Sequence, residues 1–151
     1  MPEPTFRRAT NDDADAVARV GAAMWEELGA QSGLPGPMTP EGVRSRLAEW
    51  GERGGLFVCD SGDGVCGFAI VQPDVNHPSE AVMGVWLLPD ARGKGLGRDL
   101  AVMGTEFAKA AGYKSLRGII PEGNQPALSF FGDFASMAQM VGQGMEYELP
   151  L

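Results

Sequence analysis

The sequence predicts a three-layered α/β domain of the α+β type, in which helices cover both faces of a mixed sheet. The length of 151 residues matches about one domain. Short apolar runs typical of buried strands are interspersed with segments whose apolar residues recur at helical spacing. The sequence contains no internal repeat and no low-complexity tract, so a single domain over residues 1–151 is expected.

The first third of the chain predicts a strand followed by two helices. After a short strand at 6–9, Thr10 and Asp13 have the spacing of a capping-box variant that starts a helix ending near Gly29. A Gly/Pro loop follows at 31–38, and Thr39 then begins the second helix as N-cap with Pro40 at N1. Apolar residues at helical spacing mark the two buried faces: Val17, Val20, Met24 and Leu28, then Val43, Leu47 and Trp50.

A hairpin is predicted next, with strands at 56–59 and 66–71. A turn centred on Gly62-Asp63 would place Cys59 and Cys66 opposite each other. Because a reducing compartment is expected, we predict two free, half-buried thiols and no disulfide.

The second half predicts a loop at 73–79, a strand at 82–88, and a glycine-rich turn that opens a helix ending at Gly112. The remaining predicted segments are a strand at 116–120, a short helix at about 124–134, and a terminal hairpin of 137–141 with 145–149.

Composition excludes several classes of partner. A formal net charge of −8 argues against a non-specific nucleic-acid binder. No apolar run is long enough to cross a bilayer, and the N-terminus does not have the pattern of a signal peptide, so a cytoplasmic protein is expected. One histidine and two cysteines at this spacing predict no metal site. The acidic surface would attract a cationic amine, or would simply keep the protein in solution.

The stretch Arg92-Gly93-Lys94-Gly95-Leu96-Gly97 lies between a predicted strand and a helix N-terminus. Backbone N–H groups without intrahelical partners and the helix dipole make such a turn a binding site for anions. A P-loop would need a glycine at position 88, where Leu88 stands, and the dinucleotide pattern would need glycine at 98 or 100. Both nucleotide patterns therefore fail, and a phosphate or pyrophosphate ligand of another kind is expected.

Arg92, Gly95 and Gly97, directly after a strand ending in Leu-Pro, resemble the acetyl-CoA signature of the GNAT N-acetyltransferase superfamily. The segments 6–14 and 124–131 resemble its first strand and helix and its later Asn-x-x-Ala-x-x-aromatic segment, in the same order. The resemblance runs from about Thr5 to Phe134. It implies a single GNAT-like domain with a mostly antiparallel sheet.

The resemblance implies acetyl-CoA as cosubstrate, with its pyrophosphate at the glycine-rich turn and its pantetheine arm along the strand ending at Leu87 and Leu88. A backbone N–H around these two residues would polarise the thioester. Asn124 matches a position that contacts the CoA arm, and Phe131 would pack near the sulfur. The residues expected to bind the pyrophosphate are Arg92, Gly93, Lys94, Gly95, Leu96, Gly97 and Arg98.

For deprotonation of the amine, Glu80 is the first choice of base, because a partly buried carboxylate would have a raised pKa. His77 is the second choice, since it titrates near neutral pH. A water relay or an already neutral amine would replace both. The usual tyrosine acid aligns with Phe131, which leaves Ser129 as the nearest hydroxyl.

A small-molecule amine is the favoured acceptor, held by the loop 31–38, by Trp25 and by the loop 73–79. If the chain is an enzyme with a different acceptor, it acetylates a protein N-terminus or a lysine. If it is not an enzyme, it is a non-catalytic module that binds acyl-CoA. The oligomeric state stays open, a homodimer included.

Overall fold

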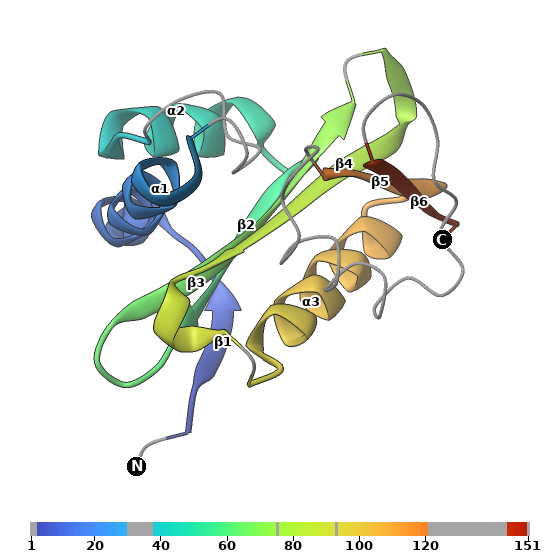
Figure 1. Ribbon diagram of the computed structural model, residues 1–151. Coiled ribbons are helices and arrows are strands. Elements are labelled where there is room, and N and C mark those ends of the chain that lie inside the picture. Colours follow the sequence, from blue (N-terminus) through green and yellow to red (C-terminus); the bar gives the residue numbers. More distant parts are fainter. Residues whose placement is uncertain (1–2, 30–37, 75, 93, 121–144, 151) are drawn as a thin grey trace.

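The computed structural model describes residues 3–29, 38–74, 76–92, 94–120 and 145–150 (Figure 1). The described strands form one six-stranded sheet in the order β1-β2-β3-β4-β5-β6. Neighbouring strands are antiparallel except β4 and β5, which are parallel, so the predicted mixed, mostly antiparallel sheet is confirmed. The strands are β1 (Thr5–Arg8), β2 (Gly55–Asp60), β3 (Val65–Asp74), β4 (His77–Leu87), β5 (Ser115–Ile120) and β6 (Met145–Pro150).

Helices cover both faces of this sheet, as predicted. Helices α1 (Ala14–Leu28) and α2 (Pro40–Trp50) lie on one face, and α3 (Leu96–Ala110) lies on the other (Figure 1). Because side chains alternate along a strand, β3 contributes to two cores. Phe68 and Ile70 pack with α1 and α2, whereas Ala69 and Val71 pack with α3. None of the described helices is long and apolar enough to cross a membrane.

The predicted capping arrangement begins the first helical segment. Thr10 donates its backbone N–H to Asp13 Oδ2 at 2.8 Å. Arg7 on β1 grips the same carboxylate through both guanidinium nitrogens, at 2.6 and 2.7 Å. A 3₁₀ turn at Asn11–Asp13 precedes α1, which the sequence did not indicate.

The β2–β3 turn is where it was predicted, but the register beyond it differs. Ser61 N donates to Gly64 O at 3.1 Å, so Gly62 and Asp63 are the central residues. A bulge then pairs Cys59 with Gly67 instead of Cys66, because Cys66 is the extra residue. The two sulfur atoms lie 3.6 Å apart as free thiols, and both residues are buried instead of half-buried.

The prediction of a loop at 73–79 is wrong. Strand β3 continues to Asp74 and β4 begins at His77, which leaves residues 75 and 76 between them. Pro73 is tolerated because β2 pairs with β3 only as far as Val71, so no ladder partner is lost on that side.

Strand β6 pairs with β5 in antiparallel register. The proposed partner strand at 137–141 and the short helix at 124–134 lie outside the described residues.

Candidate functional site

Strands β4 and β5 are paired only over a short stretch. The register joins Glu80 to Ser115, Ala81 to Leu116 and Val82 to Arg117. Beyond Val82, β4 continues to Leu87 with no β5 partner among the described residues. The far half of β4 thus offers a backbone edge, to which an extended ligand can bind like an added strand.

The backbone groups that face this edge follow from strand alternation. Leu88 donates its N–H to Cys66 O on β3 at 2.9 Å, and its carbonyl accepts from Ala91 N at 2.9 Å. The Leu88 backbone is therefore occupied. Along a strand, the backbone N–H and C=O groups of successive residues point to opposite neighbouring strands. Since Leu88 bonds to β3, Val85 and Leu87 direct their backbone groups to the open edge. The Leu87 carbonyl also accepts from Arg92 Nε at 3.2 Å.

The open edge leads to the N-terminus of α3. Gly95 is the N-cap with φ +81°, a left-handed conformation that favours glycine. The first helical hydrogen bond joins Asp99 N to Gly95 O at 3.2 Å, so the N–H groups of 96–98 have no acceptor within the helix. A Cβ at Gly95 would meet no atom within 4 Å, and Lys94 and Arg98 are exposed beside it. This terminus has room and charge for an anion; Gly93 lies outside the described residues.

Arg92 is engaged with α1 in this structure. Its Nη2 lies 2.6 Å from Glu27 Oε1, and its Nη1 lies 3.2 Å from the other carboxylate oxygen. Together with the bond to Leu87 O, this bidentate pair ties the turn after β4 to the end of α1. Arg92 thus holds the turn after β4 against α1. Its direct contact with CoA remains a prediction.

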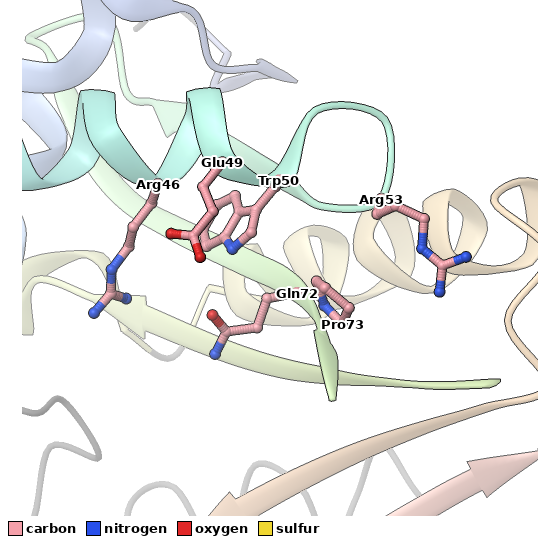
Figure 2. Close-up of a pocket in the computed structure, with 6 residues that line it drawn as sticks. All are labelled: Arg46, Glu49, Trp50, Arg53, Gln72 and Pro73. Carbon is pink, nitrogen blue, oxygen red and sulfur yellow. The ribbon is translucent and has the colours of Figure 1, made fainter. Parts of the chain in front are cut away.

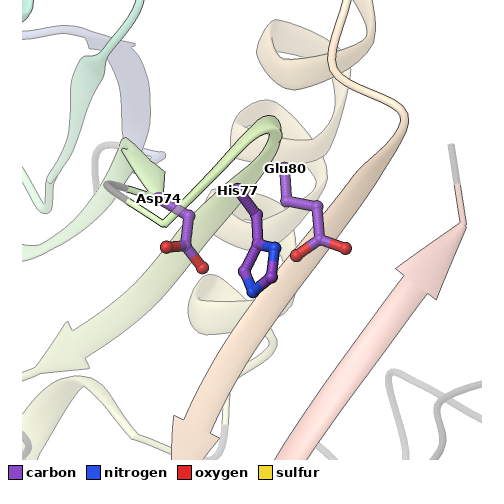
Figure 3. A group of neighbouring side chains, drawn as sticks. All are labelled: Asp74, His77 and Glu80. Carbon is purple, nitrogen blue, oxygen red and sulfur yellow. The ribbon is translucent and has the colours of Figure 1, made fainter.

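Polar side chains gather near the β3–β4 turn, where the pairing of β4 with β5 begins. Asp74, His77 and Glu80 each have one side-chain oxygen or nitrogen atom within 4.8 Å of those of the other two. Figure 3 shows the His77 ring between the two carboxylates. Arg117 on β5 reaches both acids, at 3.6 Å from Asp74 and 3.3 Å from Glu80. We call these four residues the apex cluster. The structure thus brings together the two candidate bases, which the sequence offered as separate alternatives.

The electrostatics of the apex cluster favour a cationic ligand. Glu80 Oε2 is buried and accepts no well-directed hydrogen bond within the described residues, but Arg117 Nη2 lies 3.3 Å from this same oxygen as an ion pair. Because the ion pair compensates the charge of this oxygen without a well-directed hydrogen bond, the oxygen can still accept one from a ligand N–H. Two carboxylates and one guanidinium leave a net charge of −1 when His77 is neutral. Carboxylates and imidazole are also metal-binding groups, but Arg117 already supplies a cation to both acids, and we assign no metal.

Sequence reasoning missed Asp74 and Arg117. The only signal would have been the register across three strands, which places both on the sheet face covered by α1 and α2. Asn124, Ser129 and Phe131 lie outside the described residues, as does most of the loop 31–38, so their roles stay predictions. Trp25 is described and is half-buried on α1.

Comparison with known proteins agrees with this geometry. The family model described as "Acetyltransferase (GNAT) domain" matches residues 5–132. A mycothiol acetyltransferase of Geodermatophilus obscurus is 32% identical over 133 residues, covering 84% of this chain and 41% of that protein. The chain therefore spans about two fifths of the length of this curated relative.

Two solved structures show the same fold. A Salmonella typhimurium protein with its cofactor acetyl-CoA has a TM-score of 0.83 at 17% identity, covering 99% of this chain and 95% of that chain. A phosphinothricin acetyltransferase of Sinorhizobium meliloti in complex with acetyl-CoA has a TM-score of 0.83 at 18% identity, covering 99% and 89%. With the family model matching most of its length, the chain belongs to the GNAT acetyltransferase family.

Proposed function

We propose that this chain transfers the acetyl group of acetyl-CoA directly to a primary amine of a small molecule within a ternary complex. The observation that carries the proposal is the open edge of β4. It leads from the N-terminus of α3, where the pyrophosphate is expected, to the short paired stretch Glu80–Val82, beside which the apex cluster with its net negative charge lies. The matched curated relatives are mycothiol acetyltransferases, which favours a small-molecule acceptor.

The donor would lie along β4. Its pyrophosphate would accept N–H bonds from Leu96 and Gly97, with Lys94 and Arg98 adding positive charge. The pantetheine amides would pair with the backbone of Leu87. At about 3.3 Å per residue, Val85 lies roughly 10 Å along the strand from Val82, and Leu87 roughly 16 Å. Val85 N–H is therefore the better-placed group to polarise a thioester carbonyl near the apex cluster.

The acceptor amine would bind beside Glu80, whose Oε2 is ion-paired with Arg117 and accepts no well-directed hydrogen bond among the described residues. Glu80 would accept the proton of the amine, with His77 as the second group within reach. The amine nitrogen attacks the thioester carbonyl, the carbon–sulfur bond breaks, and CoA leaves as thiolate. A thiol with a pKa of about 8.5 is a fair leaving group, so this step does not depend on a tyrosine at position 131.

The test is release of free CoA from acetyl-CoA in the presence of a panel of small amines and short peptides. We expect amine-dependent release with at least one small amine. Release with peptides alone would replace this proposal by protein acetylation. Calorimetric binding of acetyl-CoA with no release for any amine would favour a binding module.

A further inference from the structure

A cavity of about 400 Å³ lies between α2 and β3, on the sheet face that also carries the apex cluster. Arg46 and Glu49 extend from α2 toward the strands, and Gln72 and Pro73 face them from β3 (Figure 2). The complete lining consists of Arg46, Glu49, Trp50, Arg53, Gln72 and Pro73. Of these residues, only Pro73, as part of the segment 73–79 expected to hold the acceptor, belonged to a sequence-based prediction of a binding site.

The register places this cavity beside the proposed reaction centre. Gln72 pairs with Val82, and Val82 pairs with Arg117 as the last described β4–β5 partner. Adjacent strands lie about 4.8 Å apart, so the floor of the cavity is one strand from the point where β4 and β5 separate. Pro73 leads directly to Asp74 of the apex cluster. This adjacency would let a molecule with its amine at Glu80 extend toward the cavity.

The charge of the cavity is opposite to that of the apex cluster. Arg46 is half-buried, and within the described part of the chain its guanidinium forms no hydrogen bond or ion pair. Arg53 donates to Pro78 O at 2.8 Å and stacks over the Tyr113 ring at 4.7 Å, so it is held in place but not neutralised. Glu49 is the one acid in the lining, which leaves a net charge of +1.

We propose that this cavity binds an anionic group of the acceptor, so that the substrate is a small amine that also carries a carboxylate. The inference rests on the proposed function. Arg46 would form the bidentate pair that guanidinium makes with carboxylate, and Gln72 would donate from its amide. The two subsites, one positive and one negative, are complementary to a molecule that is cationic at one end and anionic at the other.

The test uses pairs of acceptors that differ by one carboxyl group: each amino acid and the amine obtained by removing that group. We expect the amino acid of the best pair to have a KM at least tenfold below that of its partner. Arg46→Gln should remove this difference by raising the KM of the amino acid with little change in kcat, and Arg46→Lys should restore part of it. Arg44→Gln is the matched control, because Arg44 is exposed on the same helix and lies 3.7 Å from Asp15, away from the cavity.

Equal KM values within every pair, or an Arg46→Gln effect that is the same for both members, would overturn the inference. A binding measurement separates this result from failure of the proposed function. Saturation-transfer NMR with CoA-saturated protein would detect Arg46-dependent binding of the amino acid even without turnover. Binding without turnover would refute the proposed catalytic activity and leave the anionic subsite standing. If no carboxylate-bearing amine binds or reacts while other amines do, the proposed function stands and the anionic subsite is refuted.

Discussion

Glu80 forms an ion pair with Arg117, and of the two only Glu80 was predicted from the sequence. The sequence predicted Glu80 because a carboxylate at the entry of a buried strand is a plausible base, and the structure places it against Asp74, His77 and Arg117. The arginine could not be predicted, because its proximity depends on a parallel register between strands that are distant in sequence. Local patterns therefore suggested the acid and omitted its partners.

The substitution Glu80→Gln keeps the shape of the side chain and removes its basicity. We predict a fall in kcat of roughly tenfold to a thousandfold with unchanged affinity for acetyl-CoA. Steady-state kinetics across pH and calorimetry measure the two quantities, and Glu106→Gln, exposed on α3, is the control. An unchanged pH–rate profile would move the role to His77, to water or to no base.

The two cysteines are predicted to be inert in the native protein. Burial, followed by the hydrogen bond with Cys66, raises the pKa of Cys59 to about 12, so its reactive thiolate is scarce at neutral pH. A disulfide-exchange reagent should react slowly with the folded protein, and with both thiols in denaturant without prior reduction. Protein that needs a reductant before two thiols appear would refute this.

At the scale of elements, the turn into α3 is the feature that the sequence predicted best. Its glycines sit between a strand and a helix, and Gly95 has the positive φ that such a turn requires. The clamp between Arg92 and Glu27 was not predictable, because it joins this turn to a helix far away in the chain. The end of β3 was misplaced because proline and a short turn in sequence look like a loop.

Replacement of Gly95 by alanine should weaken acetyl-CoA binding at least tenfold, because the added methyl occupies the open space expected for the pyrophosphate. Gly112→Ala is a matched control. Gly112 follows α3 with φ +92°, and a Cβ there also meets nothing within 4 Å. Both variants should lose thermal stability from backbone strain, but only Gly95→Ala should lose affinity by calorimetry. Equal affinities in the two variants would place the pyrophosphate elsewhere.

The capping arrangement before α1 makes a pH-dependent contribution to stability. The hydrogen bonds from Arg7 hold the pKa of Asp13 below its ordinary value near 4. The stabilisation by this carboxylate is therefore fully present above about pH 4, and it is lost as the pH falls through the lowered pKa. Asp13→Asn should lower Tm by about 2–4 °C at neutral pH, for a cap worth on the order of 1 kcal/mol. The difference should shrink in thermal melts below about pH 4. A difference that grows with acidity would contradict the assignment.

At the scale of the whole molecule, the periodicity of apolar residues was sufficient to predict the layers and most of the helices and strands, since both depend on local apolar spacing. The functional geometry depends on where β4 and β5 separate and on which side chains then meet across β3, β4 and β5. Those facts come from long-range register, which no local pattern encodes. The cavity with Arg46 was missed for the same reason, because α2 and β3 meet only in the folded chain.

The most direct test of this account is a crystal structure of the chain with acetyl-CoA bound. We predict the pyrophosphate on the N–H groups of Leu96 and Gly97, the pantetheine amides hydrogen-bonded to the backbone of Leu87, and the thioester carbonyl accepting from Val85 N–H. The thioester should lie on the side of β4 that carries the Glu80 carboxylate. Acetyl-CoA bound away from the open edge of β4, or with its acetyl group remote from Glu80, would contradict it.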